Sequence, residues 1–100
     1  MSTLYITEYQ DAAKDREGKQ IEAGREPAVA VQTPVTFTTS VASAAFNGKT
    51  TLVRIYSDAD CHLLFGSAPT ATTSSTPMKA DTPEYFGVIP GHKVAAINAA

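Results

Sequence analysis

The sequence has no tryptophan, a single cysteine and no long apolar run. A lone cysteine, Cys61, cannot form an internal disulfide, so a small disulfide-stapled scaffold is excluded. No apolar stretch approaches the roughly 18 residues that a membrane-spanning helix needs. The opening residues, MSTLYITEY, also lack the basic and apolar regions of a secretion signal. We therefore expect a chain that is made soluble, stays soluble and has no membrane partner.

Charge is scarce as well, with 8 Lys and Arg against 10 Asp and Glu in 100 residues. Proteins that bind a phosphate backbone carry a basic patch, which this balance does not supply, so nucleic acid is not an expected partner. Nine of the 18 charged residues lie between Asp11 and Glu26. This polar segment contains two glycines, so we expect a mobile arm or long loop, with a short helical turn at 11–17 as the alternative.

The remainder of the chain consists of short β-type runs that end at Gly, Pro or Ser/Thr. We predict an all-β fold, a small antiparallel β-sandwich or jelly-roll-like barrel of seven to eight strands with a charged N-terminal arm or loop. The length suits a single domain, with an N-terminal strand and charged arm over 1–27 and the β-sandwich domain over 28–100. The clearest runs are LYITEY (4–9), VTFTTSV (35–41), TLVRIYS (51–57), CHLLFG (61–66), PEYFGV (83–88) and HKVAAIN (92–98).

Alternation within these runs predicts which side chains are buried. Val53 and Ile55 are expected to point inward, and Cys61 and His62 are expected to point to opposite faces of their strand. The dipeptides Asn47-Gly48 and Pro90-Gly91 predict two hairpin turns. The uncharged segment 67–77 predicts one long surface loop, and 78–80 a short strand.

A cluster of potential metal ligands, Asp58, Asp60, Cys61 and His62, is the strongest chemical feature of the sequence. Cys61 and His62 are adjacent on a predicted strand, so at most one of them joins a shared site. His62 and His92 are the only histidines, and no nucleophile elbow or phosphate-binding loop is present. We therefore expect no enzyme activity, no metal, no cofactor and no small-molecule substrate.

Four aromatic residues leave two interpretations open. Tyr56, Phe65, Tyr85 and Phe86 lie on different predicted strands. They would either form a sugar-stacking platform on one sheet face or belong to the core, which is the commoner arrangement. The first interpretation favours a carbohydrate-binding or host-adhesion module.

Several motifs resemble small virion-associated structural proteins of tailed bacteriophages and prophages, over roughly residues 4–9 and 50–97. P-E-Y-F-G-V stands at 83–88, P-G-x-K-V-A at 90–95 and L-Y-I-T-E-Y at 4–9. The longest motif is S-D-x-x-C-x-x-x-F-G-x-x-P-T-A-T, made by Ser57, Asp58, Cys61, Phe65, Gly66, Pro69, Thr70, Ala71 and Thr72.

This resemblance implies a protein of the virion, with no catalytic residues to carry over. We expect a capsid decoration or cement protein that is made in the host cytoplasm, lies on the capsid surface, and binds the major capsid protein and copies of itself, with a trimer as one form. A head-to-tail connector or tail component is the alternative within the same particle. The expected contact elements are the segment from Tyr5 to Glu26 and the loop from Ser67 to Pro77. The expected contact residues are Tyr5, Tyr9, Lys14, Arg16, Arg25, Thr70, Thr72 and Thr73.

Overall fold

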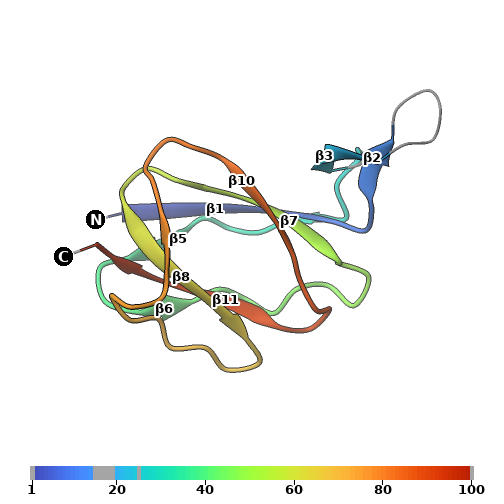
Figure 1. Ribbon diagram of the computed structural model, residues 1–100. Coiled ribbons are helices and arrows are strands. Elements are labelled where there is room, and N and C mark those ends of the chain that lie inside the picture. The colour runs from blue at the N-terminus through green and yellow to red at the C-terminus, as the bar shows by residue number, and fades with distance from the viewer. Residues whose placement is uncertain (1, 15–19, 25, 100) are drawn as a thin grey trace.

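In a computed structural model, the alternating runs form two antiparallel sheets that pack against each other, and a two-stranded ribbon stands off one end (Figure 1). The structure describes residues 2–14, 20–24 and 26–99, and these residues form eleven strands and no helix. The strands are β1 (Ser2–Tyr9), β2 (Ala12–Lys14), β3 (Gln20–Gly24), β4 (Ala30–Val31), β5 (Val35–Phe37), β6 (Val41–Ala42), β7 (Leu52–Ser57), β8 (Cys61–Gly66), β9 (Thr76–Met78), β10 (Glu84–Gly87) and β11 (Lys93–Asn98).

The first strand, β1, lies in the middle of the five-stranded sheet. It pairs with β7 along one edge, from Leu4 opposite Ser57 to Tyr9 opposite Leu52, and β10 lies beyond β7. Along its other edge β1 pairs with β5 near its start and with β4 near its end. Pro34 lies between β4 and β5, and it cannot donate to a ladder, so the partner strand is divided in two.

The four-stranded sheet has the order β6-β11-β8-β9. Its two long strands pair from Lys93 opposite Gly66 to Asn98 opposite Cys61. We call this sheet and the five-stranded sheet together the two-sheet body, and β2 with β3 the ribbon.

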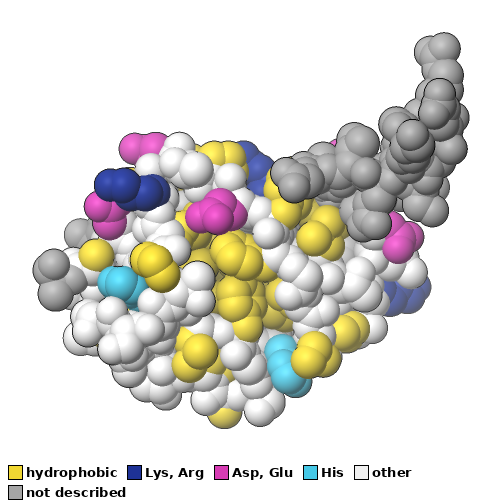
Figure 2. All heavy atoms as spheres, viewed as in Figure 1, with side chains coloured by type: hydrophobic (Ala, Val, Ile, Leu, Met, Phe, Trp, Pro, Cys, Tyr) yellow, Lys and Arg dark blue, Asp and Glu magenta, His cyan; other side chains and the backbone are white. Residues whose placement is uncertain are grey.

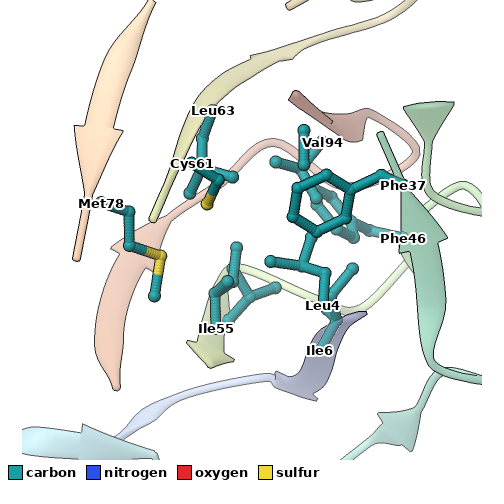
Figure 3. Close-up of a cluster of buried hydrophobic side chains, with 11 residues drawn as sticks. Leu4, Ile6, Phe37, Phe46, Ile55, Cys61, Leu63, Met78 and Val94 are labelled. Atoms are coloured by element: carbon teal, nitrogen blue, oxygen red, sulfur yellow. The ribbon is translucent and has the colours of Figure 1, made fainter. Parts of the chain in front are cut away.

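The core lies between the two sheets, as Figure 3 shows. Aliphatic side chains of β1 and β7 point into it from one sheet and those of β8 and β11 from the other, so burial follows the alternation of each strand. The buried cluster consists of Leu4, Ile6, Phe37, Phe46, Val53, Ile55, Cys61, Leu63, Met78, Val94 and Ala96.

Much of the predicted pattern is confirmed. The fold is all-β with antiparallel sheets, Val53 and Ile55 are fully buried, and Cys61 is buried in the core while its neighbour His62 is only partly covered. The structure has eleven strands instead of seven or eight because several ladders are only two or three residues long. The segment expected as a mobile arm or long loop instead forms the paired strands β2 and β3 in its described residues, and the alternative helical turn at 11–17 is likewise wrong at Ala12–Lys14. Residues 15–19 lie outside the described part.

Both predicted hairpins are wrong, although both turns are present. Thr50 N–H bonds the Asn47 carbonyl and His92 N–H bonds the Ile89 carbonyl, at 3.0 and 3.1 Å. The strands on either side of each turn join different sheets, since β6 and β11 lie in one and β7 and β10 in the other. Each turn therefore takes the chain from one sheet to the other. The turn dipeptide does not determine whether the flanking strands pair. The predicted strand at 78–80 forms as β9, two residues earlier.

Candidate functional site

The ribbon is fixed at its base by Tyr9, the last residue of β1. The Tyr9 side chain is only 3% exposed, and a methyl group at Gly24 of β3 would overlap its ring. The Tyr9 hydroxyl donates a 2.8 Å hydrogen bond to Glu26 Oε2, and the ring centroid lies 6.2 Å from that of Tyr85 on β10. The ribbon therefore leaves the two-sheet body from a packed and hydrogen-bonded junction.

Burial raises the pKa of Tyr9 to about 12 from 10.0, and the hydrogen bond to Glu26 and its negative charge act in the same direction. Below pH 10 the folded and unfolded chains both keep the proton. Between pH 10 and about 12 the unfolded chain loses it first, so the free energy of unfolding falls. We expect Tyr9→Phe to flatten this decline in denaturant titrations across that range. An equally steep decline in the variant would contradict the assignment.

A buried carboxylate, Glu8, joins two connecting segments to β1, the one between β4 and β5 and the one between β6 and β7. Glu8 is 2% exposed. Its Oε1 accepts hydrogen bonds from the Asn47 N–H and the Thr50 hydroxyl, at 2.7 and 2.8 Å, and its Oε2 accepts one of 3.0 Å from Gln32 Nε2. Bonds to a charged acceptor are the stronger kind. Sequence reasoning assigned Glu8 no role, although an acidic residue on the inward face of a strand is itself a signal, because buried charges need partners.

Besides the covered Tyr9, three tyrosines and an arginine share the outer face of the five-stranded sheet. The register places Tyr5 opposite Tyr56 and Arg54 opposite Tyr85. Tyr5 is 45% exposed, and its ring centroid lies 5.9 Å from that of Tyr56. The Tyr56 hydroxyl donates a 2.6 Å hydrogen bond to Asp81, and this bond raises the pKa of the phenol. The face offers aromatic rings with hydrogen-bonding edges.

The four aromatic residues of the predicted platform lie on two different sheet faces, because neighbouring residues of a strand point in opposite directions. Tyr56 and Tyr85 lie on the outer face, whereas Phe65 and Phe86 pack against the core with ring centroids 5.1 Å apart. The core interpretation therefore holds for Phe65 and Phe86, and Tyr56 and Tyr85 are the two that remain on an outer sheet face. The exposed Tyr5, which was not in the predicted platform, lies beside Tyr56 and completes the outer group.

The loop between β8 and β9 is tied to the four-stranded sheet. Ala71 is 2% exposed, and its N–H bonds Ser40 Oγ at 2.8 Å. The Ser75 carbonyl lies 3.0 Å from His62 Nδ1, and the Ser75 N–H closes a turn onto the Thr72 carbonyl at 3.0 Å. The loop is therefore an ordered structure with an exposed tip.

The potential metal ligands Asp58, Asp60, Cys61 and His62 have structural roles in this fold. Asp58 Oδ1 accepts the Thr3 N–H and Asp60 Oδ1 accepts the Ala80 N–H, both at 2.8 Å, and burial raises the pKa of the Cys61 thiol. His62 pairs with Ile97, near the end of β11 away from His92. Among the residues that the structure describes, no three His, Cys, Asp or Glu side chains are placed to hold a metal ion. No helix of the described ranges has the length and apolarity to cross a bilayer.

The predicted contact residues fall into three groups. Tyr5 and the loop threonines Thr70, Thr72 and Thr73 are exposed, so a partner can reach them. Tyr9 is buried at the ribbon base, and we remove it from the contact set. The backbone of Lys14 lies on β2, while its side chain and all of Arg16 and Arg25 are outside the described residues.

Comparison with known proteins gives no match, whether with protein-family models, curated proteins or solved structures. Function must therefore be argued from the surfaces described above and from the sequence motifs.

Proposed function

We propose that this chain is a non-enzymatic structural protein of a tailed-phage virion, a capsid decoration or cement protein. It binds the lattice of the major capsid protein on the capsid surface and stabilises the head. Its partners are the capsid protein and further copies of itself. The sequence motifs at 4–9, 57–72 and 83–95 support this assignment.

The ribbon is the observation that carries the proposal. A protein that links neighbouring subunits needs an element that reaches beyond its own body, and the ribbon stands off one end of the two-sheet body (Figure 1). Residues 11–26 also hold nine of the 18 charged residues of the chain. The junction at Tyr9 and Glu26 fixes the direction in which the ribbon leaves, which lowers the conformational entropy lost on binding.

The mechanism is purely physical. A β-sandwich bound in many copies stabilises the assembled shell in proportion to its occupancy, because it binds the assembled state better than free subunits. The ribbon and the exposed loop residues Thr70, Thr72 and Thr73 supply the contacts. No bond-making chemistry is required.

Cosedimentation with empty, expanded capsids tests the proposal. We expect the unchanged chain to bind in numbers that scale with the major capsid protein. A variant with 14–20 replaced by Asn-Gly keeps the ribbon base at Ala12 and Gly24, and it should lose most of this binding while its melting temperature stays unchanged. Lys79→Gln, which removes a highly exposed cation from the two-sheet body, is the matched control and should bind normally.

Other outcomes identify the other assignments. One ring of copies per particle would place the protein at the connector or tail. Absence from every particle fraction would contradict a virion role. Full binding by the shortened variant would contradict the ribbon as the anchor while leaving the decoration role intact.

The tyrosine face supports a second candidate, a carbohydrate-binding or host-adhesion module. Exposed aromatic rings stack on sugar rings, and Tyr5 is 45% exposed beside Tyr56. A glycan array with the unchanged chain and Tyr5→Ala tests this candidate. Binding that the substitution abolishes without lowering stability would favour adhesion, and no binding to any glycan would exclude it.

A further inference from the structure

The strand β10 leaves one edge of the five-stranded sheet unpaired. Among the described residues, β7 is the one strand that pairs with it in that sheet. The other outer strands of the two-sheet body are shorter, and two of them are limited by proline: β9 contains Pro77 and β5 follows Pro34. Short edges and prolines block the addition of further strands. With four residues and no proline, β10 is the edge best suited to pairing.

The register identifies which main-chain groups face outward. Val88 N–H bonds the Thr51 carbonyl at 2.9 Å, so this pair continues the β10–β7 ladder as a hydrogen-bonded pair. Hydrogen-bonded pairs alternate along an antiparallel ladder, which turns the groups of Phe86 toward β7 and those of Tyr85 and Gly87 away from it. Within the described residues, no hydrogen bond satisfies these outward N–H and C=O groups.

An apolar stripe lies beside this edge. Phe86 of β10 touches Phe65 of β8 across the gap between the sheets, and both rings are only partly buried. Ile89, just past β10, is 61% exposed. An open pocket of about 520 Å³ lies between Met78 of β9 and Glu84 of β10. Figure 2 shows hydrophobic side chains gathered in the middle of this face.

We propose that β10 pairs antiparallel with β10 of a second copy of this chain, forming one continuous sheet across a twofold axis at Phe86. In this register Tyr85 lies opposite Gly87 of the second copy, and the two residues exchange main-chain hydrogen bonds on each side of the axis. Phe86 meets its own equivalent, so the two apolar stripes cover each other. The interface uses the purified chain alone and is independent of any particle.

Self-complementarity is what favours a second copy over another partner. A Cβ at Gly87 would meet nothing within 4 Å, so no atom of the same copy crowds the position that faces Tyr85 of the other copy. Glu84 lies opposite Val88 of the second copy. The two Glu84 carboxylates are then separated by four residues along the paired strands, about 13 Å, where repulsion is largely screened.

A matched pair of variants at Gly87 tests the interface by sedimentation equilibrium. Gly87→Ala keeps the outward N–H, whereas Gly87→Pro removes it and places a ring where the second strand would bind. Neither touches the β7 ladder. We expect dimers for the unchanged chain and Gly87→Ala, and at least a tenfold weaker dimer for Gly87→Pro (about two lost hydrogen bonds), with unchanged circular dichroism. A monomer at every concentration, or an equally strong Gly87→Pro dimer, would overturn the proposal.

Amide hydrogen exchange of the unchanged chain provides a test that needs no variant. The amides of Tyr85 and Gly87 should exchange rapidly at low concentration and slowly at high concentration. The Phe86 amide, which bonds β7 within one copy, should be slow at both. If the exchange rates of the Tyr85 and Gly87 amides do not depend on protein concentration, pairing through β10 is contradicted, even if dimers form through another surface.

Discussion

A chain that lacks residues 2–9 will not fold. These residues form β1, which is paired along both edges and contributes Leu4 and Ile6, each 1% exposed, to the core. Truncating one such side chain to alanine costs about 2–5 kcal/mol. A small domain is typically stable by about 5–15 kcal/mol. The loss of both side chains, together with the ladders to β4, β5 and β7, exceeds this stability.

Circular dichroism and thermal unfolding of this truncated chain measure the effect. We expect no cooperative transition and no dispersed amide resonances. The comparison is the variant with 14–20 replaced by Asn-Gly, which loses residues from the ribbon but none from the two-sheet body, and it should unfold cooperatively. A cooperative transition in the chain without 2–9 would show that β1 is dispensable. The N-terminal segment therefore has two parts, a strand that the fold requires and a ribbon that it does not.

Glu8→Leu is expected to lower the free energy of unfolding by about 3 kcal/mol or more. The leucine fits an apolar interior, but it leaves the donors of Asn47, Thr50 and Gln32 without their acceptor. The Thr50 hydroxyl is the costliest of these, because Thr50 is 0% exposed and water cannot replace the carboxylate. For a domain of this size the melting temperature should fall by about 12–24 °C.

Four further variants separate the charge of Glu8 from its hydrogen bonds. Glu8→Gln keeps one oxygen for Asn47 and Thr50 but brings its amide against the Gln32 donor, so its cost should be intermediate. Thr50→Val removes the stranded hydroxyl, and the Glu8→Leu/Thr50→Val pair should cost less than the sum of the two single variants. Asp11→Leu, at an exposed carboxylate, should change stability by no more than about 0.5 kcal/mol. Equal losses for Asp11→Leu and Glu8→Leu would contradict the network.

The strand interiors of this protein could be predicted from the sequence because alternation is local. Val53 and Ile55 are buried as their positions in a period-two run predict, and Cys61 and His62 lie on opposite faces as expected. The turns at Asn47-Gly48 and Pro90-Gly91 were likewise recognisable, because few residues favour these backbone conformations, and Gly91 has a φ of 83°.

The candidate surfaces could be predicted only in part. The exposure of Thr70, Thr72 and Thr73 follows from a polar, uncharged loop. That Tyr5 is exposed while Tyr9 is buried does not, since both lie on the same face of β1. The difference arises because Gly24, fifteen residues further along the chain than Tyr9, covers one ring and not the other.

The sequence by itself determined the all-β class, the inward residues of the long strands and the absence of a recognisable catalytic motif, because each depends on residues close together in the chain. Only the tertiary structure decided which strands pair. Long-range pairing placed β1 in the middle of a sheet, sent the two turns across the body and left β10 as a free edge. These choices depend on how much apolar surface distant segments bury against one another. No local sequence pattern contains that information.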